Sequence, residues 1–160
     1  MRERPPIVFV TPYYPPFGAG GAEFTASLHA RLLVERGQPV VVVTPNYGGA
    51  PREAVDGVEI VRHELVSLGR AGQQAAARRF ASPLYHRRLA DEVILALGGR
   101  RPLCIHAQHQ FMAHGAAAAA ARLSAPFVAH LRDTSQICGL GALCLLEVGN
   151  DRPPPSCGLY

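Results

Sequence analysis

Two short apolar runs constrain the fold more strongly than any other feature of this sequence: Ile7-Val8-Phe9-Val10 and Val40-Val41-Val42-Val43. Runs of four apolar β-formers predict strands that are buried on both faces, as in parallel sheets. Between them, residues 22–36 carry apolar side chains at helical spacing, and Gly37 is a natural helix end. The order strand, loop, helix, strand predicts a parallel sheet with right-handed crossovers.

The rest of the chain repeats this alternation of short apolar runs and helical segments. Strands are predicted at residues 7–11, 40–44, 103–106 and 127–130, and helices at residues 22–36, 80–97 and 111–123. A short extended piece is expected at residues 55–61, around Asp56-Gly57. The last strand, which ends in His130, is expected to be buried. The predicted fold class is therefore α/β: a Rossmann-like open parallel sheet with helices on both faces.

The length of 160 residues suits one domain, which we assign to residues 1–150. Residues 151–160 are rich in proline and are expected to form a ragged end without a closing element. The cysteines lack the paired CxxC spacing of a zinc site, so reduced thiols and no metal are expected; they are Cys104, Cys138, Cys144 and Cys157.

The formal charge of +4 comes from arginine, since the chain contains no lysine. Scattered arginines indicate a basic surface that is either only solvated or attracts an anionic lipid or a phosphorylated ligand. No nucleic-acid-binding motif accompanies the charge, so nucleic acid is not expected as a partner. The chain shows no secretory signal and no apolar stretch near the roughly 20 residues that span a bilayer. The expected location is cytoplasmic, with peripheral membrane contact left open.

A glycine-rich segment separates the first predicted strand from the first helix, with Gly18, Gly20 and Gly21 ahead of Glu23. Backbone without Cβ atoms, followed by the free N–H groups of a helix start, suits an anionic group such as a diphosphate. The alternative is a tight turn that only lets the helix pack on the sheet. A dinucleotide fingerprint would need glycine where Glu23 stands, and no acidic residue ends the second strand, so a nicotinamide-dependent oxidoreductase is disfavoured.

Three histidines, His106, His109 and His114, follow an H-x2-H-x4-H spacing across a predicted strand end and helix start. Neither cysteine nor carboxylate lies near them at metal-ligand spacing, so we interpret them as structural or cleft histidines. No P-loop, nucleophile elbow or pair of catalytic carboxylates is present, and no cofactor is expected.

Five short segments, in the order of the chain, share residue patterns with one known enzyme family. They are Val8-Phe9-Val10-Thr11-Pro12-Tyr13-Tyr14-Pro15-Pro16 with Gly20-Gly21-Ala22-Glu23, Arg36-Gly37-Gln38-Pro39-Val40, Asp56-Gly57-Val58-Glu59-Ile60, Ile105-His106-Ala107-Gln108-His109, and Pro126-Phe127-Val128-Ala129 with Arg132-Asp133. Together they resemble glycosyltransferase family 4. That family often has His-Asp where this chain has Arg132-Asp133, although one branch shows a similar Arg-Asp pattern that ends in cysteine.

The resemblance implies the N-terminal, acceptor-side half of a GT-B arrangement, in which two Rossmann-like domains face a cleft. The donor-binding C-terminal domain is expected to be absent from these residues. By the resemblance, Gly20, Gly21, Glu23 and His109 are candidate substrate-binding residues. Arg132 and Asp133 are candidate catalytic residues, although Arg132 cannot accept a proton.

The function that the resemblance implies is a retaining transfer of a sugar, of hexosyltransferase type. The partners would be a nucleotide-sugar donor and a carbohydrate or lipid-linked acceptor hydroxyl. Residues 1–160 alone are expected to be inactive without the donor domain. The alternative is a truncated or non-catalytic Rossmann-like binding module.

Overall fold

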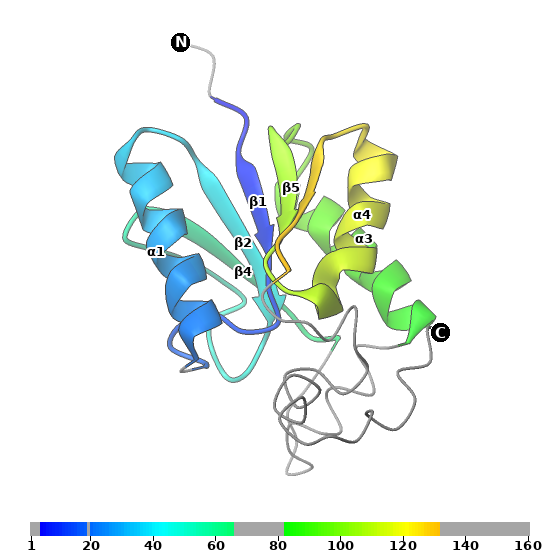
Figure 1. Cartoon of the computed structure of the whole chain (residues 1–160), viewed down its shortest axis with the longest axis horizontal. Helices are drawn as coiled ribbons and strands as arrows, with labels where there is room; N and C mark the ends of the chain where they lie inside the picture. Colours follow the sequence, from blue (N-terminus) through cyan, green and yellow to red (C-terminus); the bar gives the residue numbers. More distant parts are fainter. Residues whose placement is uncertain (1–3, 19, 66–81, 132–160) are drawn as a thin grey trace, which may run out of the picture. The chain divides into compact units, whose positions relative to one another are not determined.

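The computed structural model describes residues 4–18, 20–65 and 82–131, nearly all of which belong to one compact unit, Met1–His130. Its elements, in chain order, are β1 (Ile7–Val10), α1 (Gly21–Glu35), β2 (Val40–Pro45), β3 (Arg52–Val55), β4 (Val58–His63), α3 (Pro83–Leu97), β5 (Cys104–Ala107), α4 (Gln110–Leu123) and β6 (Phe127–Ala129). Figure 1 shows helix α1 on one face of the sheet and α3 and α4 on the other.

The six strands form one open sheet in the order β3-β4-β2-β1-β5-β6. Every neighbouring pair is parallel except β3 and β4, which are antiparallel. The predicted fold class is confirmed: the unit is a mostly parallel, Rossmann-like α/β sheet with helices on both faces. The four predicted parallel strands correspond to β1, β2, β5 and β6, with ends that differ by one residue at most.

The inner strands are buried on both faces because their alternate side chains enter two separate cores. Val8 and Val10 of β1 pack with α3 and α4 residues such as Leu89. Phe9, between those two valines, packs on the other face with Ala30 of α1. This division explains why the first two strands read as unbroken apolar runs rather than as an alternation.

Two expectations from the sequence need correction at the edges of the sheet. Residues 55–61 do not form one extended piece, because Asp56 and Gly57 have positive φ angles of 51° and 76° and turn the chain into a β3–β4 hairpin. The strand at 127–130 is not buried. All three residues of β6 are exposed, with Val128 at 44%, because β6 is an edge strand of the described sheet.

Helix α3 also starts later than predicted. The predicted range was 80–97, whereas α3 begins at Pro83, and residues 80 and 81 lie outside the described residues. Proline suits the first position of a helix, because its missing N–H needs no partner there. Gly98, in the left-handed region at φ 56°, ends the helix.

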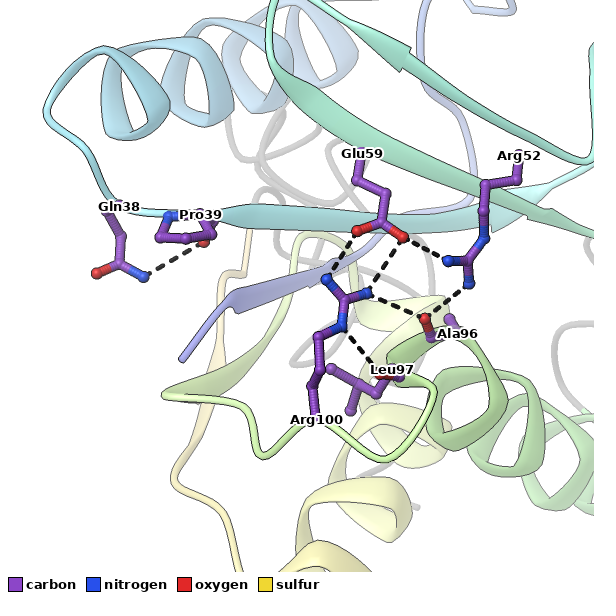
Figure 2. A network of polar contacts seen from close by, with 7 residues as sticks. All are labelled: Gln38, Pro39, Arg52, Glu59, Ala96, Leu97 and Arg100. Carbon is purple, nitrogen blue, oxygen red and sulfur yellow. Dashed lines mark hydrogen bonds and ion pairs between the residues drawn. The ribbon is translucent and has the colours of Figure 1, made fainter. Parts of the chain in front are cut away.

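A polar network ties the β3–β4 hairpin to the end of α3 (Figure 2). Both carboxylate oxygens of Glu59 accept hydrogen bonds from Arg100, at 2.9 and 3.1 Å. Arg52 donates to Glu59 at 2.7 Å and to the carbonyl of Ala96 at 2.8 Å. Arg100 also donates to the carbonyl of Leu97 at 2.9 Å, so the arginines cap the C-terminal end of α3.

Candidate functional site

The topology of the sheet creates a switch point at the carboxyl ends of two neighbouring strands, β1 and β5. Strands β1 and β5 are neighbours, yet β1 leads through α1 to β2 on one side and β5 leads through α4 to β6 on the other. Figure 1 shows α1 and α4 on opposite faces of the sheet. The chain therefore leaves these strands in opposite directions, and ligands of open α/β sheets bind at such switch points.

Polar side chains are buried where the strands end at this edge. Those with at most 9% exposure are Thr11, Thr44, Arg62, His63, Gln108 and Gln110. Backbone hydrogen bonds hold the first residue of the loop after β1 and of the loop after β5. The N–H of Thr11 donates to the carbonyl of Val43 at 3.1 Å, and the N–H of Gln108 donates to the carbonyl of Val10 at 2.9 Å. The start of each loop at the switch point is thus fixed by the sheet itself.

Three glycines, Gly18, Gly20 and Gly21, shape the chain at the start of α1. Gly18 has φ 105°, and a Cβ atom there would lie 2.8 Å from Cβ of Tyr13, so this position requires glycine. Gly20 is the N-cap of α1, and no side chain caps the first turn. A Cβ atom on Gly21 would meet nothing within 4 Å. The start of α1 is therefore open, with N–H groups that have no helical acceptor.

The carboxylate of Glu23 lies directly at this open helix start. A Cβ atom on Gly20 would contact Oε2 of Glu23, and one on Gly18 would lie 3.0 Å from its Cγ. The side chain therefore folds back over the glycine segment, where its charge complements the positive end of the helix dipole. An incoming anion and the Glu23 carboxylate cannot both occupy this position.

Aromatic residues line the adjoining loops. The rings of Tyr13 and Tyr47 stack with centroids 5.4 Å apart, and the hydroxyl of Tyr47 donates to the carbonyl of Pro12 at 2.8 Å. Burial raises the pKa of Tyr13, and the nearby charge of Glu23 raises it further. Burial is also the main reason why the pKa of Tyr47 lies above its usual value. Both phenols are therefore neutral hydrogen-bonding groups near neutral pH.

Arg62, near the end of β4, lies beneath the same loops. Its side chain is fully buried, pairs with Glu53 at 2.5 Å and donates to the carbonyl of Ala50 at 3.1 Å. A Cβ atom on Gly49 would lie 2.9 Å from the guanidinium, so the loop after β2 packs directly on it. Within the described residues, Nε and Nη2 of Arg62 have no hydrogen-bond partner.

His109 is the N-cap of α4, on the other side of the switch point from Gly20. Its Nδ1 accepts a hydrogen bond from the N–H of Phe111 at 3.3 Å, and the two rings lie 4.7 Å apart. A neutral imidazole that accepts at Nδ1 carries its proton on Nε2. The structure thus gives His109 a capping role, and its donor faces away from the capped N–H.

The three histidines singled out by spacing do not converge. His106 packs edge-on against Phe9 at 5.2 Å, whereas the ring of His114 lies 5.2 Å from that of His86 on α3. Across the described residues, no group of three or more His, Cys, Asp or Glu side chains could hold a metal ion. Cys104 is a free thiol.

Sequence reasoning missed His63, which ends β4 and is 3% exposed. Burial lowers the pKa of His63 to about 4, while a backbone hydrogen bond acts in the opposite direction. Its Nδ1 accepts from the N–H of Leu65 at 3.4 Å. In the sequence, the only signal for His63 as a site residue is its position at the end of a strand. Arg132, Asp133 and the three later cysteines lie outside the described residues.

Comparison with known proteins shows the family to which this chain belongs. Residues 20–154 match the model of the glycosyl transferase 4-like domain. The apo structure of UGT2 from Phytolacca americana is similar at 15% sequence identity and a TM-score of 0.49, over 92% of this chain and 34% of that chain. The present chain thus spans about a third of the length of that protein. No protein with a curated description matches the sequence.

Proposed function

Because the chain belongs to the glycosyl transferase 4-like domain family, we propose that it is the acceptor-side, N-terminal domain of a retaining glycosyltransferase. In this proposal the complete enzyme moves a sugar, as a hexosyltransferase does, from a nucleotide-sugar to a hydroxyl of a carbohydrate or lipid-linked acceptor. The proposed setting is cytoplasmic, with contact to a membrane surface. Within the described ranges no helix has the length and apolar character to cross a bilayer.

The observation that carries the proposal is the switch point between β1 and β5, which is flanked by two helix starts. Gly20 and Gly21 open α1 on one side, and His109 caps α4 on the other. The N–H groups and dipole of α1 suit the leaving diphosphate of a nucleotide-sugar. The protein's contribution would be to position the substrates and to stabilise developing negative charge.

Glu23 would act on the acceptor side. Its carboxylate can accept hydrogen bonds from sugar hydroxyls, and it lies within reach of the glycine segment. When a diphosphate approaches Gly21, repulsion would turn the Glu23 side chain away from the helix start. Donor binding and the position of the acceptor ligand would therefore be linked through one side chain.

Arg132 and Asp133 remain candidate catalytic residues in this proposal. They follow β6 in the sequence, and β6 is the neighbour of β5 in the sheet. Arg132 is a permanent cation that can bind phosphate or hydroxyl oxygens but cannot serve as a base. Asp133 would accept the hydrogen bond of an acceptor hydroxyl.

A binding screen tests the proposal. Isothermal titration of residues 1–160, and of a longer version that includes a donor domain, with a panel of uridine, guanosine and adenosine diphosphate sugars should give binding to the longer version. Transfer is then followed by NMR, which reports the anomeric configuration of the product. A product with inverted configuration would contradict retention. A longer version that binds sugar nucleotides but transfers nothing would favour the non-catalytic binding module.

Residues 1–160 alone should show no turnover. The candidate groups that the structure describes lie at the carboxyl ends of the strands of one open sheet. Sugar transfer requires both substrates to be aligned in a cleft that excludes water. Sugar transfer by the purified 160-residue chain, absent from a Gly21→Val control, would overturn this part of the proposal.

A further inference from the structure

A small basic cavity lies at the amino ends of the strands, on the opposite edge of the sheet from the switch point. It has a volume of about 240 Å³ and is lined by Arg4, Pro5, Pro6, Pro39, Arg100 and Arg101. These residues lie in the segments that lead into β1, β2 and β5. The cavity is therefore assembled from three connections that the parallel sheet brings together.

The charges around this cavity are strongly one-sided. Three of its six lining residues are arginines, and none is a carboxylate. Arg100 is held in place by Glu59, and Arg4 donates to the carbonyl of Gly37 at 3.3 Å. Arg101 is exposed and makes no hydrogen bond or ion pair with any residue that the structure describes. Two guanidinium groups can thus turn toward an anion beside a third that is already fixed.

A second and larger cavity adjoins the first. Its volume is about 660 Å³, and it shares Pro5, Arg100 and Arg101 with the basic cavity. The other walls are largely apolar and include Leu97, Leu103, Leu123 and Pro126. Leu103 is 49% exposed, so apolar surface is accessible two residues from the Arg101 guanidinium. A ligand that fits both cavities has an anionic end and an apolar body.

We propose that this amino-edge site binds a phosphate ester with an apolar substituent. Arg4 and Arg101 bind the phosphate, which guanidinium groups recognise through paired N–H donors, and Arg100 lines the same cavity. The adjoining apolar cavity holds the substituent. The phosphate group belongs either to an anionic phospholipid in a bilayer or to a free phosphate ester. The site lies away from the switch point, and it does not depend on the proposed transferase activity.

The test is calorimetric titration of the 160-residue chain with short-chain phosphatidate below its critical micelle concentration, with inorganic phosphate as the comparison. Phosphatidate should bind more tightly than inorganic phosphate. The Arg4→Gln/Arg101→Gln double variant should bind it roughly 25-fold more weakly, since one arginine near an anionic surface contributes about fivefold. Binding should also weaken as salt is added.

The matched control is Arg87→Gln/Arg88→Gln, which removes the same charge from exposed positions of α3. It should leave the affinity unchanged. Equal loss in the two double variants would show non-specific charge attraction, and equal affinity for phosphate and phosphatidate would remove the apolar cavity from the site. Either result, or no binding at all, overturns the proposal.

Vesicles then distinguish the two sources of the phosphate. Co-sedimentation with phosphatidylglycerol vesicles but not with phosphatidylcholine vesicles, lost in Arg4→Gln/Arg101→Gln, supports a membrane phospholipid. Binding of soluble phosphatidate without vesicle binding supports a free phosphate ester instead.

Discussion

The guanidinium carbon of Arg62 lies 5.5 Å from the centre of the Phe17 ring, although Arg62 belongs to strand β4 and Phe17 to the loop after β1. This contact joins the β3–β4 hairpin to the segment that leads into the glycine loop. A cation over an aromatic face is attracted more strongly when it is removed from water. The position of the glycine loop therefore depends on a charge that Glu53 balances.

Glu53→Gln should destabilise the fold by at least about 2 kcal/mol, because it leaves a buried cation uncompensated. The figure is below that for a fully buried pair because the Glu53 side chain is 34% exposed. The double variant Glu53→Gln/Arg62→Met should recover part of this loss, since it also removes the charge and the two unpaired donors. Urea unfolding measures both. A double variant no more stable than Glu53→Gln alone would contradict this account.

Gly21→Val should cut turnover strongly in an active transferase that contains this domain, with little loss of thermal stability. A Cβ atom at Gly21 meets no neighbour within 4 Å, so the fold can accept the side chain. The side chain would project into the space that the phosphate needs, and one lost preorganised donor raises a barrier by about 3 to 4 kcal/mol.

The matched comparison for Gly21→Val is Gly18→Ala. Alanine at position 18 would have to adopt φ 105° and contact Tyr13, so it should lower the melting temperature even though it lies in the same loop. If Gly21→Val folds and keeps wild-type turnover, the glycines serve packing alone and the anion site is wrongly assigned.

His63 should make the fold less stable in acid. The pKa of His63 is lowered from 6.5 to about 4 in the folded state, so the unfolded chain takes up its proton first as the pH falls. The free energy of unfolding that depends on neutral His63 is fully present above pH 6.5 and is lost as the pH falls toward 4. The full effect is about 3 kcal/mol. The free energy of unfolding of the wild type should thus fall more steeply with acid than that of His63→Gln, and parallel profiles would refute the assignment.

Glu59→Gln should destabilise the fold by about 1 to 3 kcal/mol, because Glu59 accepts charge-assisted bonds from two arginines that also cap α3. Asp91→Asn is the matched control. Its pair with Arg122, at 2.6 Å, has side chains about half exposed. Loss of that pair should cost less than about 1 kcal/mol. Thermal unfolding of the two variants compares them directly, and equal losses would mean that the network adds nothing beyond a surface ion pair.

The central sheet could be predicted from the sequence because β1 and β2 are buried on both faces, which leaves no polar position in either run. The β3 arm of the hairpin was missed because Arg52–Val55 is mostly exposed and carries a weak strand pattern. The Asp56-Gly57 pair was a stronger signal for a hairpin turn than for an extended piece. The burial of β6 was misjudged because an apolar run does not reveal whether a second neighbour lies beside it.

The candidate site was predictable only where it depends on local chain geometry. A turn that needs glycine and a helix start leave a pattern at Gly18 to Gly21, and the structure places both there. Arg62 could not be found in this way, because its environment is made by Gly49 and Phe17, which are distant in the sequence. The roles of Glu23 and His109 toward a substrate stay predictions.

The central position of β1 has a consequence for the growing chain on the ribosome. Ile7 pairs with Cys104, which is synthesised 97 residues later. Until that segment has emerged, one edge of an apolar strand has no partner, and both of its neighbours arrive from far along the chain. Long-range parallel pairing is slow and leaves strand edges open to aggregation. Expression of this domain should therefore depend on how quickly β5 is made and on chaperones that shield β1 in the meantime.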